Sequence, residues 1–164
     1  FCPFHVLGVK MKHARVILCI GWVGICLVAN GCWTDRVSTE LEKGLRSSNT
    51  GDYQLAIESF TKVIRLQPGN AEAHYYRGLA RYQIGLHEEA IKDYSKAILI
   101  RPSFPEAHLN RGLARHRLGD YQAAIEDMET AIQLNPRDGN AYLGREWIEA
   151  DSLEVKIGPE PKQN

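Results

Sequence analysis

The sequence predicts an all-α solenoid of three helix-turn-helix repeats followed by a C-terminal capping helix. The first observation is a period of 34 residues shared by three residue types: Gly44, Gly78 and Gly112; Ala56, Ala90 and Ala124; Pro68, Pro102 and Pro136. The second observation is that each period contains two segments of helical pattern. Units with this period stack on their neighbours and share a continuous core.

The stretch before the repeats is typical of an export signal. Met11 is the first plausible start, a short basic segment follows it, and residues 16–29 are uncharged and apolar. Small residues then precede Cys32, as they do at the end of a secretory signal peptide. We therefore expect residues 1–31 to comprise upstream sequence and a signal peptide, and residues 32–36 to form a tether.

Residues 28–32, Val-Ala-Asn-Gly-Cys, resemble the end of a bacterial lipoprotein signal. The resemblance implies that Cys32 is lipidated and that acyl chains anchor the protein in the cell envelope, outside the cytoplasm. Trp33, rather than an aspartate, follows Cys32. For that family the resemblance therefore also implies export to the outer membrane. Two alternatives remain: ordinary cleavage that releases a secreted protein, or a single uncut membrane span over residues 16–34.

Residues 37–70 form the first expected repeat. Its second helix carries an apolar stripe at helical spacing, and Gly51 followed by Asp52, a favourable N-cap, separates its two helices. The stripe recurs in the second repeat, residues 71–104, with a turn at Gly85. It recurs again in the third repeat, residues 105–138, with a turn at Gly119. Each repeat ends at a proline, which cannot continue a helix.

Residues 139–157 begin like a fourth repeat but lack its second stripe, and Glu146 stands where the glycine recurs. A terminal unit of a solenoid must present one polar face to solvent. We therefore expect a capping helix that buries Leu143, Trp147 and Ile148. The polar residues 158–164 are expected to be a disordered tail.

The repeats resemble the tetratricopeptide repeat family over residues 37–152. Of the family's Trp-x-x-Leu-Gly-x-x-Tyr pattern the middle repeat keeps only Gly78, whereas the later alanine, aromatic, alanine and proline are present as Ala90, Tyr94, Ala97 and Pro102. The resemblance implies that the first helices line a groove that accepts a peptide or helix of a partner protein. Carried over by register, it gives these candidates for partner contact: Tyr75, Tyr76, Tyr82, Asn110, His116 and Arg117.

The resemblance also places other side chains in the groove: Leu41, Glu42, Leu45, Ser48, Asn49, Leu79, Gln83, Glu106, Leu109 and Leu113. Leu79 and Leu113 have a second interpretation, which is packing between repeats. Some family members clamp a C-terminal carboxylate with lysine, asparagine and arginine. Here Asn110 is present, but Leu41 and Tyr76 occupy the matching positions, so we do not expect that ligand.

Two recurring sets of polar residues need an interpretation. Arg77 and Arg81 are like charges four residues apart, as are Arg111 and Arg115, and an aspartate follows each pair. Like charges at this spacing repel unless they are neutralised, so we expect arginine–aspartate pairs between helices, with an anion site as the alternative. His74 and His108 stand at a packing position of the repeat. We therefore expect them to pack rather than to bind metal.

Composition excludes several classes of function. The four cysteines all precede the repeats, so the repeats have no thiol for a disulfide, a metal or a nucleophile. From Cys32 onward the chain has 17 basic and 20 acidic residues, which argues against a nucleic-acid partner. No phosphate loop or hydrolase motif is present. We expect a non-catalytic adaptor of the bacterial envelope, without metal or cofactor; the alternatives are a self-associating structural protein and a non-catalytic subunit of an enzyme complex.

Overall fold

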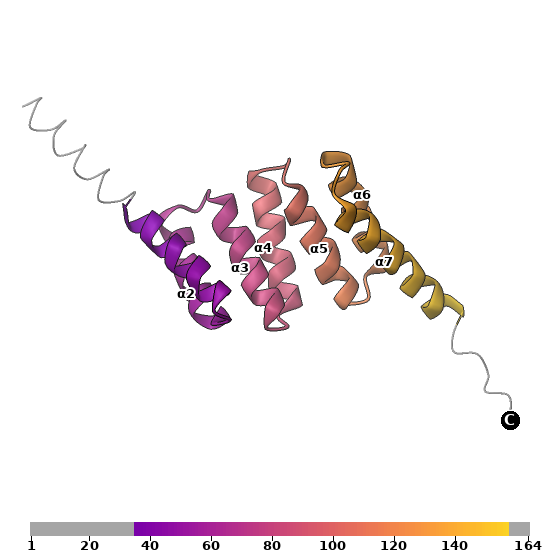
Figure 1. Ribbon diagram of the computed structural model, residues 1–164, viewed down its shortest axis with the longest axis horizontal. Helices are drawn as coiled ribbons and strands as arrows, with labels where there is room; N and C mark the ends of the chain where they lie inside the picture. Colours follow the sequence, from indigo (N-terminus) through magenta and orange to yellow (C-terminus); the bar gives the residue numbers. More distant parts are fainter. Residues whose placement is uncertain (1–34, 158–164) are drawn as a thin grey trace, which may run out of the picture. The chain divides into compact units, whose positions relative to one another are not determined.

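The computed structural model describes residues 35–157, so the predicted signal segment, Cys32 and the predicted tail lie outside the described residues. A helix at residues 35–49 is followed by α2 (Tyr53–Leu66), α3 (Ala71–Gln83), α4 (His87–Ile100), α5 (Pro105–Arg117), α6 (Tyr121–Leu134) and α7 (Gly139–Ile157) (Figure 1). No strand occurs in this range, which confirms the all-α prediction. Residues 35 and 36 are helical rather than tether, because no proline or glycine interrupts this stretch.

The helices break where the glycines predict. Gly51, Gly85 and Gly119 have φ angles of 80°, 80° and 79°, a left-handed conformation that favours glycine. The carboxylate of Asp52 accepts a hydrogen bond from the backbone N–H of Leu55 at 3.1 Å and so caps α2. These turns place the two helices of each repeat side by side.

The helices from Thr39 onward belong to one compact unit and pack in chain order (Figure 1). Among α2–α7, the first helices α3 and α5 contact each other, and so do α5 and α7. The second helices α2, α4 and α6 make no such contacts with one another. The first helices therefore form the more closely spaced layer, which is the inner side of a solenoid.

The recurring small residues lie where paired helices approach most closely. A Cβ atom added to Gly78 would lie 2.8 Å from Tyr94 Cε1, and one added to Gly44 would lie 2.6 Å from Phe60 Cε1. At Gly112 the nearest atom would be the carbonyl oxygen of Ala124, at 3.0 Å. These distances are shorter than ordinary van der Waals contacts, so a side chain at any of the three glycines would force the paired helices apart.

Helix α7 differs from the expected capping helix in what it buries. Ile148 is buried against Ala124 and Met128 as predicted, but Leu143 is 49% exposed and Trp147 is 66% exposed. That part of the prediction was wrong because no second helix follows α7 in the described chain to cover the side facing away from α6. None of the helices in residues 35–157, α7 included, has the length and apolar character needed to cross a membrane.

Candidate functional site

Two adjoining cavities open along the layer of first helices. The larger has a volume of about 430 Å³ and the smaller about 240 Å³. Tyr76 and Leu79 line both cavities, so the two lie next to each other, and we call the pair the groove. The larger cavity is lined by Glu72, Tyr75, Tyr76, Leu79, Arg101, Ser103, Phe104 and Glu106, and the smaller by Leu45, Ser48, Asn49, Tyr53, Tyr76, Leu79, Ala80 and Gln83.

Aromatic rings form the wall between the groove and the core. The Tyr75 ring centroid lies 4.8 Å from that of Phe104 and 5.3 Å from that of Tyr76. Tyr76 in turn stacks on Phe60 at 5.8 Å, and Tyr75 lies 6.0 Å from buried Tyr94. Burial, together with the nearby charge of Glu106, raises the pKa of Tyr75 to about 12. The wall is therefore a set of rings in mutual contact, in which Tyr75 stays neutral at physiological pH.

Hydrogen bonds connect the first helices of successive repeats. Asn110 Nδ2 donates to Tyr75 Oη at 3.1 Å, and Arg117 Nε donates to Tyr82 Oη at 3.2 Å. The two residues of each bond are 35 positions apart, which is one period of 34 residues plus one position. Each bond therefore links one repeat to the next. The bond to Arg117 holds that tyrosine away from the cavities.

His116 makes the same kind of connection from α5 to the capping helix. Its Nε2 lies 2.6 Å from Asp151 Oδ2, and its ring lies 5.6 Å from that of Tyr121. Among the six predicted contact residues, Tyr75 and Tyr76 line the larger cavity, and Asn110 is bonded to Tyr75. Tyr82, His116 and Arg117 lie in the last turns of α3 and α5 and line neither cavity. Partner contact by these six residues stays a prediction.

The loop between α4 and α5 supplies residues that sequence reasoning missed. Arg101, Ser103 and Phe104 line the larger cavity, together with Glu72 from the first turn of α3. The Arg101 guanidinium carbon lies 3.7 Å from the centre of the Phe104 ring, and its Nη1 lies 3.6 Å from Glu72 Oε1. An aromatic residue immediately before the proline that starts α5 was the available signal, because its buried ring (8% exposed) must pack against the preceding helices.

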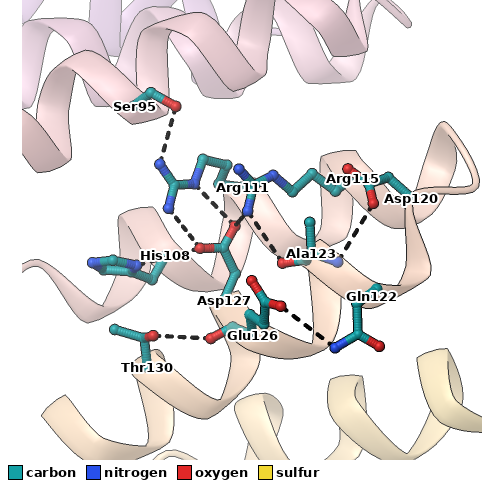
Figure 2. Close-up of polar contacts among 10 residues, drawn as sticks. All are labelled: Ser95, His108, Arg111, Arg115, Asp120, Gln122, Ala123, Glu126, Asp127 and Thr130. Carbon is teal, nitrogen blue, oxygen red and sulfur yellow. Dashed lines mark hydrogen bonds and ion pairs between the residues drawn. The ribbon is translucent and has the colours of Figure 1, made fainter.

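The arginine pairs neutralise buried aspartates, as predicted. In the third repeat, Arg111 donates from Nε and Nη2 to the two carboxylate oxygens of Asp127, at 2.9 and 2.6 Å, and from Nη1 to Ser95 at 3.0 Å (Figure 2). Arg115 adds a bond at 2.8 Å. Burial by itself raises the pKa of Asp127, but hydrogen bonds from His108 and Arg111 and the arginine charges hold it below its usual value.

The second repeat contains the same arrangement around Asp93. Arg77 donates to both carboxylate oxygens at 2.9 and 2.6 Å and to Thr61 at 3.2 Å, and Arg81 donates at 2.6 Å. These guanidinium groups are directed at Asp93 rather than into the groove, which removes the basis for the anion site.

The two histidines are packing residues, as predicted. His74 is 6% exposed and His108 is 8% exposed. His74 Nε2 lies 3.2 Å from the carbonyl oxygen of Pro68, and burial lowers the pKa of the ring. His108 Nδ1 lies 3.4 Å from Asp127. Within residues 35–157 no cluster of histidine, cysteine and acidic residues has the geometry to hold a metal ion.

Comparison with known proteins identifies the repeats. A family model described as TPR repeat matches residues 49–85 and 78–119, and a model described as tetratricopeptide repeat matches residues 105–138. No curated protein sequence matches the chain.

Solved structures with similar folds include three TPR domains. The second TPR domain of human RPAP3, in complex with the HSP70 peptide SGPTIEEVD, is 32% identical, with a TM-score of 0.69 over 71% of this chain and 98% of that one. The first TPR of Spaghetti (RPAP3), bound to the HSP90 peptide SRMEEVD, is 25% identical, with a TM-score of 0.71 over 73% and 94%. The Sgt2 TPR domain from Aspergillus fumigatus is 25% identical, with a TM-score of 0.73 over 78% and 86%.

Proposed function

Because this chain belongs to the tetratricopeptide repeat family, we propose that it is a non-catalytic adaptor that binds a segment of a partner protein in its groove. The supporting observation is the pair of adjoining cavities that share Tyr76 and Leu79. Rigid aromatic walls with polar residues at the rim are typical of sites that bind peptides. The two RPAP3 domains with similar folds are bound to peptides in their structures.

The buried ionisable groups support binding rather than catalysis. Asp93 and Asp127 are each held by two arginines, so their carboxylates are engaged in structural contacts. The groove is lined by aromatic and leucine side chains with polar and charged residues among them, and neither lining serine is hydrogen-bonded to a histidine or a carboxylate. This set can position a partner segment, but it does not form an activated catalytic group.

Site-specific photo-crosslinking tests the groove. A photoreactive phenylalanine analogue at Tyr76 of the full chain should form adducts with a partner in its native cells, because this side chain borders both cavities. The same analogue at Glu129, which is exposed on α6, is the matched control. Adducts formed only from Glu129, or equally from both positions, would contradict the proposal.

We propose further that the adaptor is a bacterial envelope lipoprotein, anchored through Cys32 and displayed outside the cytoplasm. The support is the signal-like sequence of residues 11–32. Mass spectrometry of the N-terminal peptide from membranes should find a diacylglyceryl group on Cys32, and Cys32→Ser should release the protein from the membrane. An intact peptide that runs from Met11 through Cys32 would instead indicate a membrane span, and an unmodified N-terminus just after the signal would indicate a secreted protein.

Self-association is the second candidate function, and exposed apolar residues of α7 favour it. Besides Leu143 and Trp147, Leu153 is 55% exposed and Val155 is 66% exposed. Apolar side chains left uncovered on one helix are typical of contact surfaces. Size measured in solution over a dilution series tests this candidate. If the protein self-associates through α7, Trp147→Ala should abolish the larger species. Tyr76→Ala should leave the size unchanged and abolish only partner binding.

A further inference from the structure

We propose that the larger cavity selects a partner segment in which a lysine or arginine lies next to an apolar side chain. This inference rests on the proposed function, since it specifies the chemistry of the segment that the groove binds. The apolar side chain would occupy the part of the groove lined by Tyr76 and Leu79. The cation would lie at the rim that Glu72 and Glu106 form.

The two glutamates occupy the same register in adjacent repeats. Glu72 is in the first turn of α3 and Glu106 is in the first turn of α5, one period apart, so both lie at the same end of the groove. Both are exposed and both line the larger cavity. A cation bound there would meet both carboxylates without the cost of burying either one.

The charge balance of the cavity is negative. Arg101 is its single basic lining residue, and its guanidinium already lies over Phe104 and forms an exposed ion pair with Glu72 at 3.6 Å, which leaves the charge of Glu106 unbalanced. None of the ion pairs among the described residues involves Glu106. The smaller cavity, in contrast, is lined entirely by neutral residues. Positive charge is therefore favoured at the rim, and an apolar side chain is favoured at Tyr76.

Arg101 also shows how this wall holds a cation. Its guanidinium lies 3.7 Å from the centre of the Phe104 ring, a distance typical of a cation–π contact. Tyr75 and Tyr76 offer further ring faces beside Phe104 in the same cavity. An acidic segment would find no free basic group there and would face both glutamates. The groove thus favours the opposite charge to that of the HSP70 and HSP90 peptides bound to the two RPAP3 domains.

A random peptide library with one fixed central phenylalanine, selected on the full chain at low ionic strength, tests the proposal. Binders should be enriched in lysine and arginine and depleted in aspartate and glutamate. The best binder, labelled for fluorescence anisotropy, should bind the Glu72→Gln, Glu106→Gln double variant about tenfold more weakly, with a smaller salt dependence. The control is Glu88→Gln, Glu89→Gln, which makes the same charge change on α4 outside both cavities and should leave binding unchanged.

The outcomes separate this proposal from the proposed function. Binders rich in acidic residues, or equal affinity for the double variant and wild type, would overturn the charge preference. The groove would still be the binding site if Tyr76→Ala abolished that binding. A selected peptide that binds Tyr76→Ala as well as it binds wild type would overturn both proposals. A library that yields no binder would also overturn both.

Discussion

The first repeat and the two that follow it have the same backbone but different buried polar groups. The second and third repeats bury Asp93 and Asp127, each 3% exposed and each held by two arginines. At the same register, one period earlier, the first repeat has Ser59, which is fully buried and whose hydroxyl has no hydrogen-bond partner. The first repeat forms its helix pair without a buried carboxylate, so the arginine–aspartate network is not required for the fold.

All three repeats instead share the contact between a glycine and a large side chain. Gly44 packs on Phe60, Gly78 on Tyr94, and Gly112 faces the Met128 side chain, whose Cε would lie 3.0 Å from an added Cβ. This contact sets how closely the two helices of a repeat approach. The ion network is an addition that connects a repeat to the one before it, through Thr61 in one case and Ser95 in the other.

The largest expected effect comes from removing a buried carboxylate. Asp127→Ala should lower the free energy of unfolding by about 3 kcal/mol, because it leaves the charges of Arg111 and Arg115 unpaired in a partly buried site. Ser59→Ala, at the same register in the first repeat, should be neutral or slightly stabilising, because it removes a buried hydroxyl that has no hydrogen-bond partner. Urea unfolding followed by circular dichroism measures both. Equal losses would show that the two positions are energetically equivalent and would contradict the comparison.

A smaller loss is expected where a side chain is added at the shared contact. Gly78→Ala should cost about 1 to 3 kcal/mol, because the new methyl group meets the fully buried Tyr94 ring, which has little room to move. Gly69→Ala is the matched control, since nothing lies within 4 Å of the added atom and its backbone is not left-handed. If both variants unfold at the same urea concentration, the close approach does not limit the packing.

The pH dependence of stability should originate in the later repeats. Burial lowers the pKa of His74, so below about pH 6.5 the unfolded chain takes up a proton that the folded chain resists, and stability falls as the pH decreases. Asp127, whose pKa is also lowered, should add a further loss below about pH 4. Urea midpoints measured from about pH 7.5 down to about pH 5.5 check the histidine contribution. The variant His74→Gln should flatten this slope, and an unchanged slope would refute the assignment.

The smallest expected effect concerns a hydroxyl that distinguishes the second repeat from the first. Tyr94 is fully buried and its hydroxyl has no hydrogen-bond partner. At the same register in the first repeat, Phe60 is also fully buried but carries no hydroxyl. Tyr94→Phe should therefore be neutral or stabilising by up to about 1 kcal/mol, because it removes an unsatisfied polar group. The reverse change, Phe60→Tyr, should destabilise. Thermal unfolding of the two variants tests this, and a clear loss in Tyr94→Phe would imply a partner for the hydroxyl in solution.

Contacts that recur at a fixed register in two or three repeats could be predicted from the sequence. The glycine turns and the pairing of Arg111 with Asp127 were both predicted, because each appears at a fixed register in more than one repeat. The predicted burial of Leu143 and Trp147 was wrong for the complementary reason. In a complete repeat a second helix would cover these side chains. In the described chain no helix follows α7, so they stay exposed.

The sequence alone determined the stack of paired helices, because a period of 34 residues with small residues at two registers leaves only one way for the helices to pack. Only the tertiary structure decided which of the predicted groove side chains line the cavities. Tyr76 borders both cavities, whereas Tyr82 is bonded to Arg117, and Arg101 and Phe104 enter from a loop that carries no helical period. Such contacts depend on the distances between side chains of successive repeats. The spacing of residues along the sequence does not give these distances.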